Sequence, residues 1–149
     1  MSSFRRGGAA LLVVAVALLN GGALVPGVAH ARVLGTIDFG ANYKDDGTTF
    51  TIVGAKKTFG PGERVAYVAH IPGGAGTKHM TVAFYQRSAG TLTRISKHPW
   101  NVTTITDTEF ANRYTESNMA DYGIVRPATY VMRFLNHGKL LAQGWFKRT

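Results

Sequence analysis

The chain has 149 residues, no cysteine, and a formal net charge of +9 from 17 basic and 8 acidic side chains. This length is that of one domain, with enough chain to bury a single core. The lack of cysteine excludes disulfides and also zinc or iron–sulfur sites built on thiolates, so the domain has to be held together by packing and strand pairing.

The first 31 residues have the pattern of a removable secretion signal. Arg5 and Arg6 precede an uninterrupted apolar run over 9–19, and a small-residue segment ends in Ala29-His30-Ala31. The small-x-small ending suits a signal peptidase, and the apolar run is well short of the roughly 20 residues that span a bilayer. We therefore predict a signal-peptide helix in 1–31, cleavage after Ala31, and a secreted or cell-envelope protein, periplasmic if the source is Gram-negative.

Two alternatives stay open at this end of the chain. Cleavage after Ala29 would leave His30 at the mature N-terminus, and a retained signal anchor would keep the whole segment. Cleavage after Ala31 removes Arg5 and Arg6, which lowers the net charge from +9 to +7.

The remaining positive charge is spread along the mature chain. Basic residues run from Arg32 to Arg148 without the clustering that is typical of nucleic-acid binding. We interpret the charge as an aid to solubility with weak attraction to an anionic cell envelope, and we expect no nucleic-acid partner. The membrane is expected to matter only through the signal sequence before cleavage.

Residues 32–149 alternate apolar and polar side chains in short segments broken by glycine-rich turns. Strands are predicted over 48–53, 64–71, 80–85 and 91–96, separated by turns or loops at 59–63, 73–76 and 88–90. Residues 101–105 have a strand-like composition, although the stretch 98–125 as a whole gives no clear assignment. A final hairpin is predicted from 129–135 and 140–147, with Gly138 in its turn.

About seven short strands with regularly spaced turns predict an all-β fold, either a sandwich or a barrel. Pro127-Ala128-Thr129-Tyr130 places a tyrosine just after a turn, at the start of the penultimate strand. This motif resembles the tyrosine corner of immunoglobulin-like β-sandwiches, in which the hydroxyl binds the preceding connection. Followed by an Asn-x-Gly turn and a last strand, it is similar to the end of many secreted bacterial immunoglobulin-like modules. The resemblance implies one antiparallel immunoglobulin-like sandwich over 32–149, and it implies no function.

The sequence offers no set of residues typical of an active site. It contains no Gly-x-Ser-x-Gly elbow and no His-Glu-x-x-His pair, and Asp45-Asp46 precedes Gly47 in the composition of a solvated turn. The five histidines lack a recognisable ligand-pair spacing. We therefore predict a protein that is not an enzyme and has neither metal site nor cofactor.

Two other functions are weighed against this prediction. A chain that begins at His30 would be similar to secreted copper-handling β-sandwiches with a processed N-terminal histidine, which makes exported metal handling the main alternative. A small enzyme with a carboxylate or histidine site outside known motifs is the other.

The final hairpin supplies the candidate binding residues. Side chains alternate across a strand, so a core-facing set on this hairpin leaves its neighbours outside. The set expected in the core is Tyr130, Met132, Phe134, Leu140, Ala142 and Phe146. The ligand-binding residues expected outside are Val131, Arg133, Leu135, Leu141 and Trp145.

An exposed apolar patch with tryptophan beside arginine is typical of a binding surface. The predicted function is therefore non-enzymatic binding of a protein or glycan at the cell surface. Two alternatives stay open: another segment covers this face, or a shift in register turns Trp145 into the core.

Overall fold

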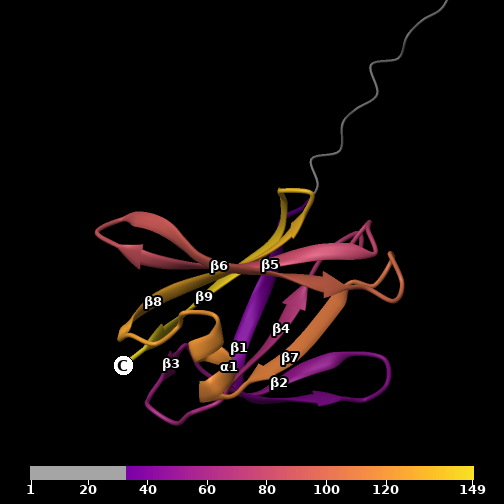
Figure 1. The fold of residues 1–149 in the computed structure, drawn as a ribbon. Helices are drawn as coiled ribbons and strands as arrows, with labels where there is room; N and C mark the ends of the chain where they lie inside the picture. The colour runs from indigo at the N-terminus through magenta and orange to yellow at the C-terminus, as the bar shows by residue number, and fades with distance from the viewer. Residues whose placement is uncertain (1–32) are drawn as a thin grey trace, which may run out of the picture. The chain divides into compact units, whose positions relative to one another are not determined.

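The computed structural model describes residues 33–149, so the predicted signal peptide and His30 lie outside the described residues. Residues 33–149 lie within one compact unit, which is all-β apart from one short helix (Figure 1). Within this unit, no helix is long and apolar enough to cross a bilayer. The elements are β1 (Gly35–Asp45), β2 (Phe50–Ala55), β3 (Thr58–Phe59), β4 (Val65–His70), β5 (His79–Ser88), β6 (Thr91–Asn101), β7 (Glu109–Tyr114), α1 (Glu116–Asp121), β8 (Ala128–Asn136) and β9 (Lys139–Arg148).

The strands form one curled sheet of mixed direction. Its hydrogen-bonded order is β6-β5-β8-β9-β1-β4-β7, with β2 paired to β1 and β3 paired to β9. Strand β9 runs parallel to the start of β1 and to β3, and the other pairs are antiparallel. In Figure 1 the β5–β6 hairpin lies on one side of the fold, and β1, β4 and β7 lie on the opposite side.

Aromatic side chains fill the space between these two regions of the sheet. Tyr67 of β4 lies with its ring centroid 6.0 Å from that of Phe134 on β8 and 6.4 Å from that of Trp100 on β6. Phe39 of β1 similarly approaches Phe146 of β9 at 5.1 Å. Aromatic pairs at these separations add to the free energy gained by burying their area. The core is therefore made by residues that the curl of the sheet brings face to face.

The predicted strands are largely confirmed. The segments 48–53, 64–71, 80–85 and 91–96 lie in or overlap β2, β4, β5 and β6, and the final hairpin is β8–β9. Residues 101–105, which have a strand-like composition within the stretch left unassigned, do not form a strand of their own, because β6 ends at Asn101 and a turn follows. In that turn the amide of Asp107 donates to the carbonyl of Thr104, and the Asp107 carboxylate accepts from the amide of Thr104. Four elements, β1, β3, β7 and α1, were not predicted.

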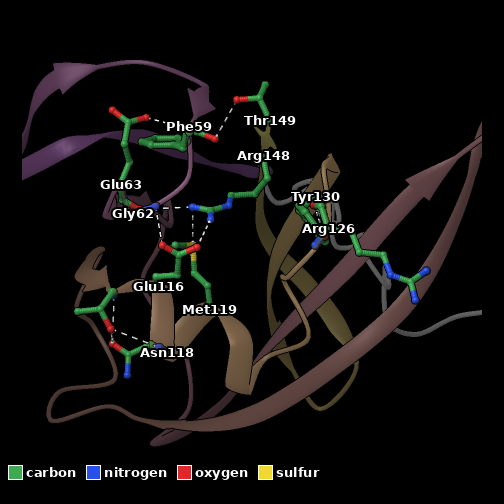
Figure 2. Close-up of polar contacts among 12 residues, drawn as sticks. Phe59, Gly62, Glu63, Glu116, Asn118, Met119, Arg126, Tyr130, Arg148 and Thr149 are labelled. Atoms are coloured by element: carbon green, nitrogen blue, oxygen red, sulfur yellow. Dashed lines mark hydrogen bonds and ion pairs between the residues drawn. The ribbon is translucent and has the colours of Figure 1, made fainter.

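Tyr130 ties the connection before β8 to the core. Its ring is fully buried, its hydroxyl donates to the carbonyl oxygen of Arg126 at 2.8 Å, and it accepts from the Arg126 amide at 3.2 Å (Figure 2). The hydrogen bond expected of a tyrosine corner is thus present. It satisfies two backbone groups next to a buried side chain, which fixes the start of β8.

The C-terminal end of β9 is held by a buried arginine. Arg148 is only 7% exposed, and its guanidinium lies 3.0 Å from the carboxylate of Glu116 in α1 (Figure 2). It also donates to the carbonyl oxygen of Glu63, while the other Glu116 oxygen accepts from the amide of Gly62. An arginine with several such acceptors can be buried at low cost. The network joins α1, β9 and the 59–63 turn, so we assign it a structural role.

Candidate functional site

One side of the strands β6, β5, β8 and β9 faces away from the core, and we call it the outer face. Residues directly opposite one another on neighbouring strands share a side of the sheet, so the strand registers define its members. The outer face consists of three cross-strand rows, each given in the order β6, β5, β8, β9: Leu92-Arg87-Thr129-Lys147, Arg94-Tyr85-Val131-Trp145, and Lys97-Ala83-Arg133-Gln143.

The structure places two of the predicted site residues on this face as expected. Trp145 is 42% exposed, so it is not a core residue. Arg133 lies in the neighbouring row and is partly buried, since its guanidinium carbon lies 4.7 Å from the ring centroid of Tyr85 and its Nε donates to Gln143. Both side chains are therefore held in place by neighbours on the same face.

The expectation for Leu141 was wrong, because this side chain belongs to the core and is 1% exposed. The register of β8 and β9 shifts between Phe134 and Leu135, so that Phe134 opposes Ala142 while Leu135 opposes Leu140. Leu141 is the extra residue of this bulge. A bulge re-aims a side chain and breaks strict alternation, which explains why Leu141 and Ala142 are both buried. Leu140, expected in the core, is only partly buried.

The remaining predicted residues do not form an exposed apolar patch. Val131 lies on the outer face but is 4% exposed, because it is flanked by Tyr85 and Trp145 on the adjacent strands. Leu135 is partly buried beyond the last of the three rows. The expectation of an exposed Val131 was therefore wrong, and Trp145 is the main apolar group that this face presents.

A shallow pocket of about 240 Å³ opens beside Trp145 on the outer face. Its lining combines apolar groups with hydrogen-bond donors and acceptors: Arg87, Leu92, Val131, Arg133, Gln143, Gly144 and Trp145. At the edge of the face, the ammonium of Lys57 lies 4.6 Å from the centroid of the Trp145 ring. Such a cation–π contact holds the indole in place while leaving much of it exposed.

Charge is unevenly distributed between the strands. The strands β5, β6, β8 and β9 contain no acidic residue and seven basic ones: Arg87, Arg94, Lys97, Arg133, Lys139, Lys147 and Arg148. Of these, only the buried Arg148 forms an ion pair within residues 33–149. The sequence did not reveal this, because residues that are scattered along the chain meet on the outer face only through strand pairing.

A second concave region, a cleft of about 610 Å³, lies between β2 and the neighbouring strands. It is lined mainly by β1 and β2, with Phe50, Ile52 and Ala55 among its apolar residues. His70 stands at this cleft between two carboxylates, with Nε2 3.4 Å from Asp38 and Nδ1 3.2 Å from Glu109. Glu109 also accepts from the amide of Phe50 at 2.8 Å. These contacts hold β2 against β4 and β7, and the lining includes no serine or cysteine to act as a nucleophile.

The remaining histidines form no metal site within the described residues. Within residues 33–149, no three histidine, aspartate or glutamate side chains are arranged to hold a metal ion. His98 stacks on Tyr122 with 4.3 Å between ring centroids, and burial lowers the pKa of its imidazole below the ordinary value. From its place on β6 it packs against the segment after α1, which fits a partly buried packing role.

No protein-family model matches the chain, and no curated protein shows significant similarity to it. The functional assignment therefore depends on the outer face. Trp145 and Arg133 were found from the alternation of the last hairpin. Tyr85 and Arg87 were missed, although they share one side of the strand predicted around 80–85 and its continuation.

Proposed function

We propose that the chain is an exported, non-enzymatic binding module of immunoglobulin-like fold, which binds a glycan at the cell surface through its outer face. The support for export is the sequence pattern of residues 1–31. The support for the binding role is the combination of an exposed tryptophan, an adjoining pocket and fixed polar groups on the outer face.

The strand order supports the immunoglobulin-like fold. The series β6-β5-β8-β9 corresponds in order to strands C′, C, F and G of variable-type immunoglobulin domains, and β4 beside β7 corresponds to B beside E. Tyr130 stands at the start of β8, where the tyrosine corner of that fold is found. The chain differs from that pattern in the added strands β2 and β3, which lie between the first strand and β4.

The surroundings of Trp145 favour a glycan over a protein partner. A protein-binding hot spot usually centres on a larger apolar patch, and burial of Leu141 and Val131 removes that patch here. A sugar ring, by contrast, needs one aromatic surface for its C–H groups and a few polar groups for its hydroxyls. Trp145 supplies the aromatic surface, and Arg133 and Gln143 supply hydrogen-bond donors and acceptors beside it. This exposed tryptophan is the single observation that carries the proposal.

Substitution of Trp145 tests the proposal directly. The wild-type protein and the Trp145→Ala variant are compared for binding to a panel of soluble polysaccharides, with Ile105→Ala as a control because Ile105 is similarly exposed at 47% but lies away from the outer face. We expect Trp145→Ala to lower affinity by about tenfold or more while shifting Tm by only a few degrees, since Trp145 is 42% exposed and lies outside the core. Retained affinity in this variant, or no polysaccharide binding by the wild type, would overturn the proposal.

A further inference from the structure

We infer that the glycan bound by the outer face is an acidic polymer, whose carboxylate or phosphate groups recur at about the length of a disaccharide. This inference rests on the proposed function and adds the chemical class of the ligand. It is carried by the separation of charges in the fold and by the spacing of cations across the strands.

The acidic residues are confined to two parts of the chain. All eight lie within 38–63 and 107–121. These residues belong to β1, β7 and α1 and to the turns that flank β2, β4 and β7. The outer face instead carries five basic residues, with Lys57 as a sixth at its edge: Arg87, Arg94, Lys97, Arg133 and Lys147. Because no carboxylate lies among them, their fields add, and an anionic ligand is attracted to this face in preference to the rest of the surface.

In two of the three rows of the outer face a pair of cations has the same spacing, and the middle row holds Arg94 as its one cation. Arg87 and Lys147 stand in one row two strands apart, and Lys97 and Arg133 stand in another row, also two strands apart. Neighbouring strands lie about 4.8 Å apart, so the backbone positions within each pair are separated by about 10 Å. A chain that crosses the strands along these rows therefore meets a basic residue at about every second strand.

The row between these two pairs carries the aromatic residues. Tyr85 and Trp145 are themselves two strands apart, with the short side chain of Val131 between them. Each has a cation next to its ring: Arg133 beside Tyr85 and Lys57 beside Trp145. This alternation of stacking surface and cation matches a polysaccharide in which acidic sugars alternate with other sugars. Arginine suits both carboxylate and phosphate, because its planar donors bind two oxygens at once.

Nucleic acid fits the same face less well. In duplex DNA each strand carries one phosphate per about 3.4 Å of helix axis, so its charges are denser along the axis than the paired cations of the outer face, which lie about 10 Å apart. Most phosphates would then remain unpaired, and only two aromatic rings are present to stack on bases. The cation spacing therefore favours an acidic glycan.

The test compares four probes on the protein purified after export. Two probes are acidic: hyaluronate oligosaccharides carry a carboxylate on every second sugar, and polygalacturonate oligosaccharides carry one on every sugar. The other two are neutral dextran oligosaccharides of equal length and single-stranded DNA of equal charge. We expect hyaluronate to bind at least about tenfold more tightly than dextran. Its affinity divided by its number of charges should be at least equal to that of polygalacturonate. The affinity should fall as salt rises above about 0.15 M, because exposed charges are increasingly screened.

Charge variants connect the affinity to the outer face. Arg87 is exposed, so Arg87→Gln should keep the fold, and Arg133→Gln removes the cation over Tyr85. Each should weaken hyaluronate binding about fivefold and weaken dextran binding less than that, because dextran carries no charge for the arginine to pair with. Arg64→Gln is the matched control, since it removes the same charge from an exposed position just before β4, and it should leave hyaluronate binding within about twofold of the wild type.

The outcomes separate the inference from the proposed function. Equal binding of dextran and hyaluronate, lost in Trp145→Ala, would overturn the acidic ligand and leave glycan binding in place. If Arg64→Gln weakened hyaluronate binding as much as Arg87→Gln, the attraction would be one of net charge and the inference would fail. Preferential binding of DNA would also overturn it, and binding of no oligosaccharide would overturn the proposed function together with the inference.

Discussion

The guanidinium of Arg133 lies over the ring of Tyr85, 4.7 Å from its centroid, although the two residues come from strands that are far apart in the sequence. The same arginine donates to Gln143 on the next strand. One basic side chain is thereby fixed across three neighbouring strands, and it loses less conformational entropy when a ligand binds than a free side chain would. This arrangement preorganises the arginine on the outer face for the proposed binding of a ligand.

Tyr130→Phe tests the anchor at the start of β8. The change removes the hydroxyl that donates to the Arg126 carbonyl and accepts from its amide, while the ring stays buried. We expect a loss of about 1–2 kcal/mol in the free energy of unfolding, measured by urea denaturation. Tyr43→Phe, at a partly exposed position, serves as the control. A Tyr130→Phe loss no larger than that of the control would show that the hydrogen bond contributes nothing.

The lowered pKa of His98 leads us to expect that the free energy of unfolding decreases in acid. Burial lowers the pKa of this imidazole in the folded state below its ordinary value of 6.5. The unfolded chain therefore binds a proton at a higher pH than the folded chain does, and the free energy of unfolding falls as pH drops through about 6.5. The free energy of unfolding of the His98→Phe variant should fall less steeply on acidification than that of the wild type. Identical pH profiles for wild type and His98→Phe would rule out this contribution.

Gly144→Ala tests the close approach of β9 and β1. A Cβ at this position would lie 2.4 Å from the carbonyl oxygen of Ile37 and 2.8 Å from the ring of Phe39. One strand must then shift, and we expect a loss of about 2–3 kcal/mol in the free energy of unfolding. In Gly60→Ala, by comparison, the nearest neighbour of the new Cβ is a carboxylate oxygen of Glu63 at 3.7 Å, so the loss should be small. Equal losses in the two variants would contradict the packing described here.

A glycine also explains why β1 was not predicted. Glycine is usually a turn signal, yet Gly35 lies within β1, where an added Cβ would be only 2.0 Å from the carbonyl oxygen of His70. The strand is specified by its neighbours β4 and β9, which local propensity does not include. The final hairpin was predictable because its alternation is strong. The prediction failed at Leu140 and Leu141, where the bulge interrupts the period of two, and at Val131, which its cross-strand neighbours cover.

The candidate site was only partly predictable for a related reason. Trp145 and Arg133 belong to one hairpin, so alternation alone placed them together. Arg87 and Lys97 join them through two further strand registers, which no spacing along the chain encodes. A charge that looks scattered in the sequence therefore becomes a single basic surface in the fold.

The N-terminus of the exported protein tests the predicted processing. Mass spectrometry of the mature chain should give Arg32 as its first residue, because Ala29-His30-Ala31 ends in the small-x-small pattern. A first residue of His30 would instead support the metal-handling alternative, and an intact segment 1–31 would contradict cleavage.

Amide NMR during titration with a hyaluronate tetrasaccharide tests the central claim most directly. The claim predicts that the largest chemical-shift changes fall on the outer face, at Tyr85, Arg87, Arg133 and the indole of Trp145, and that they weaken with added salt. Residues of β1, β4 and β7 should remain unchanged. Largest changes at the cleft beside Ile52 and His70, or no change at any concentration, would contradict the claim.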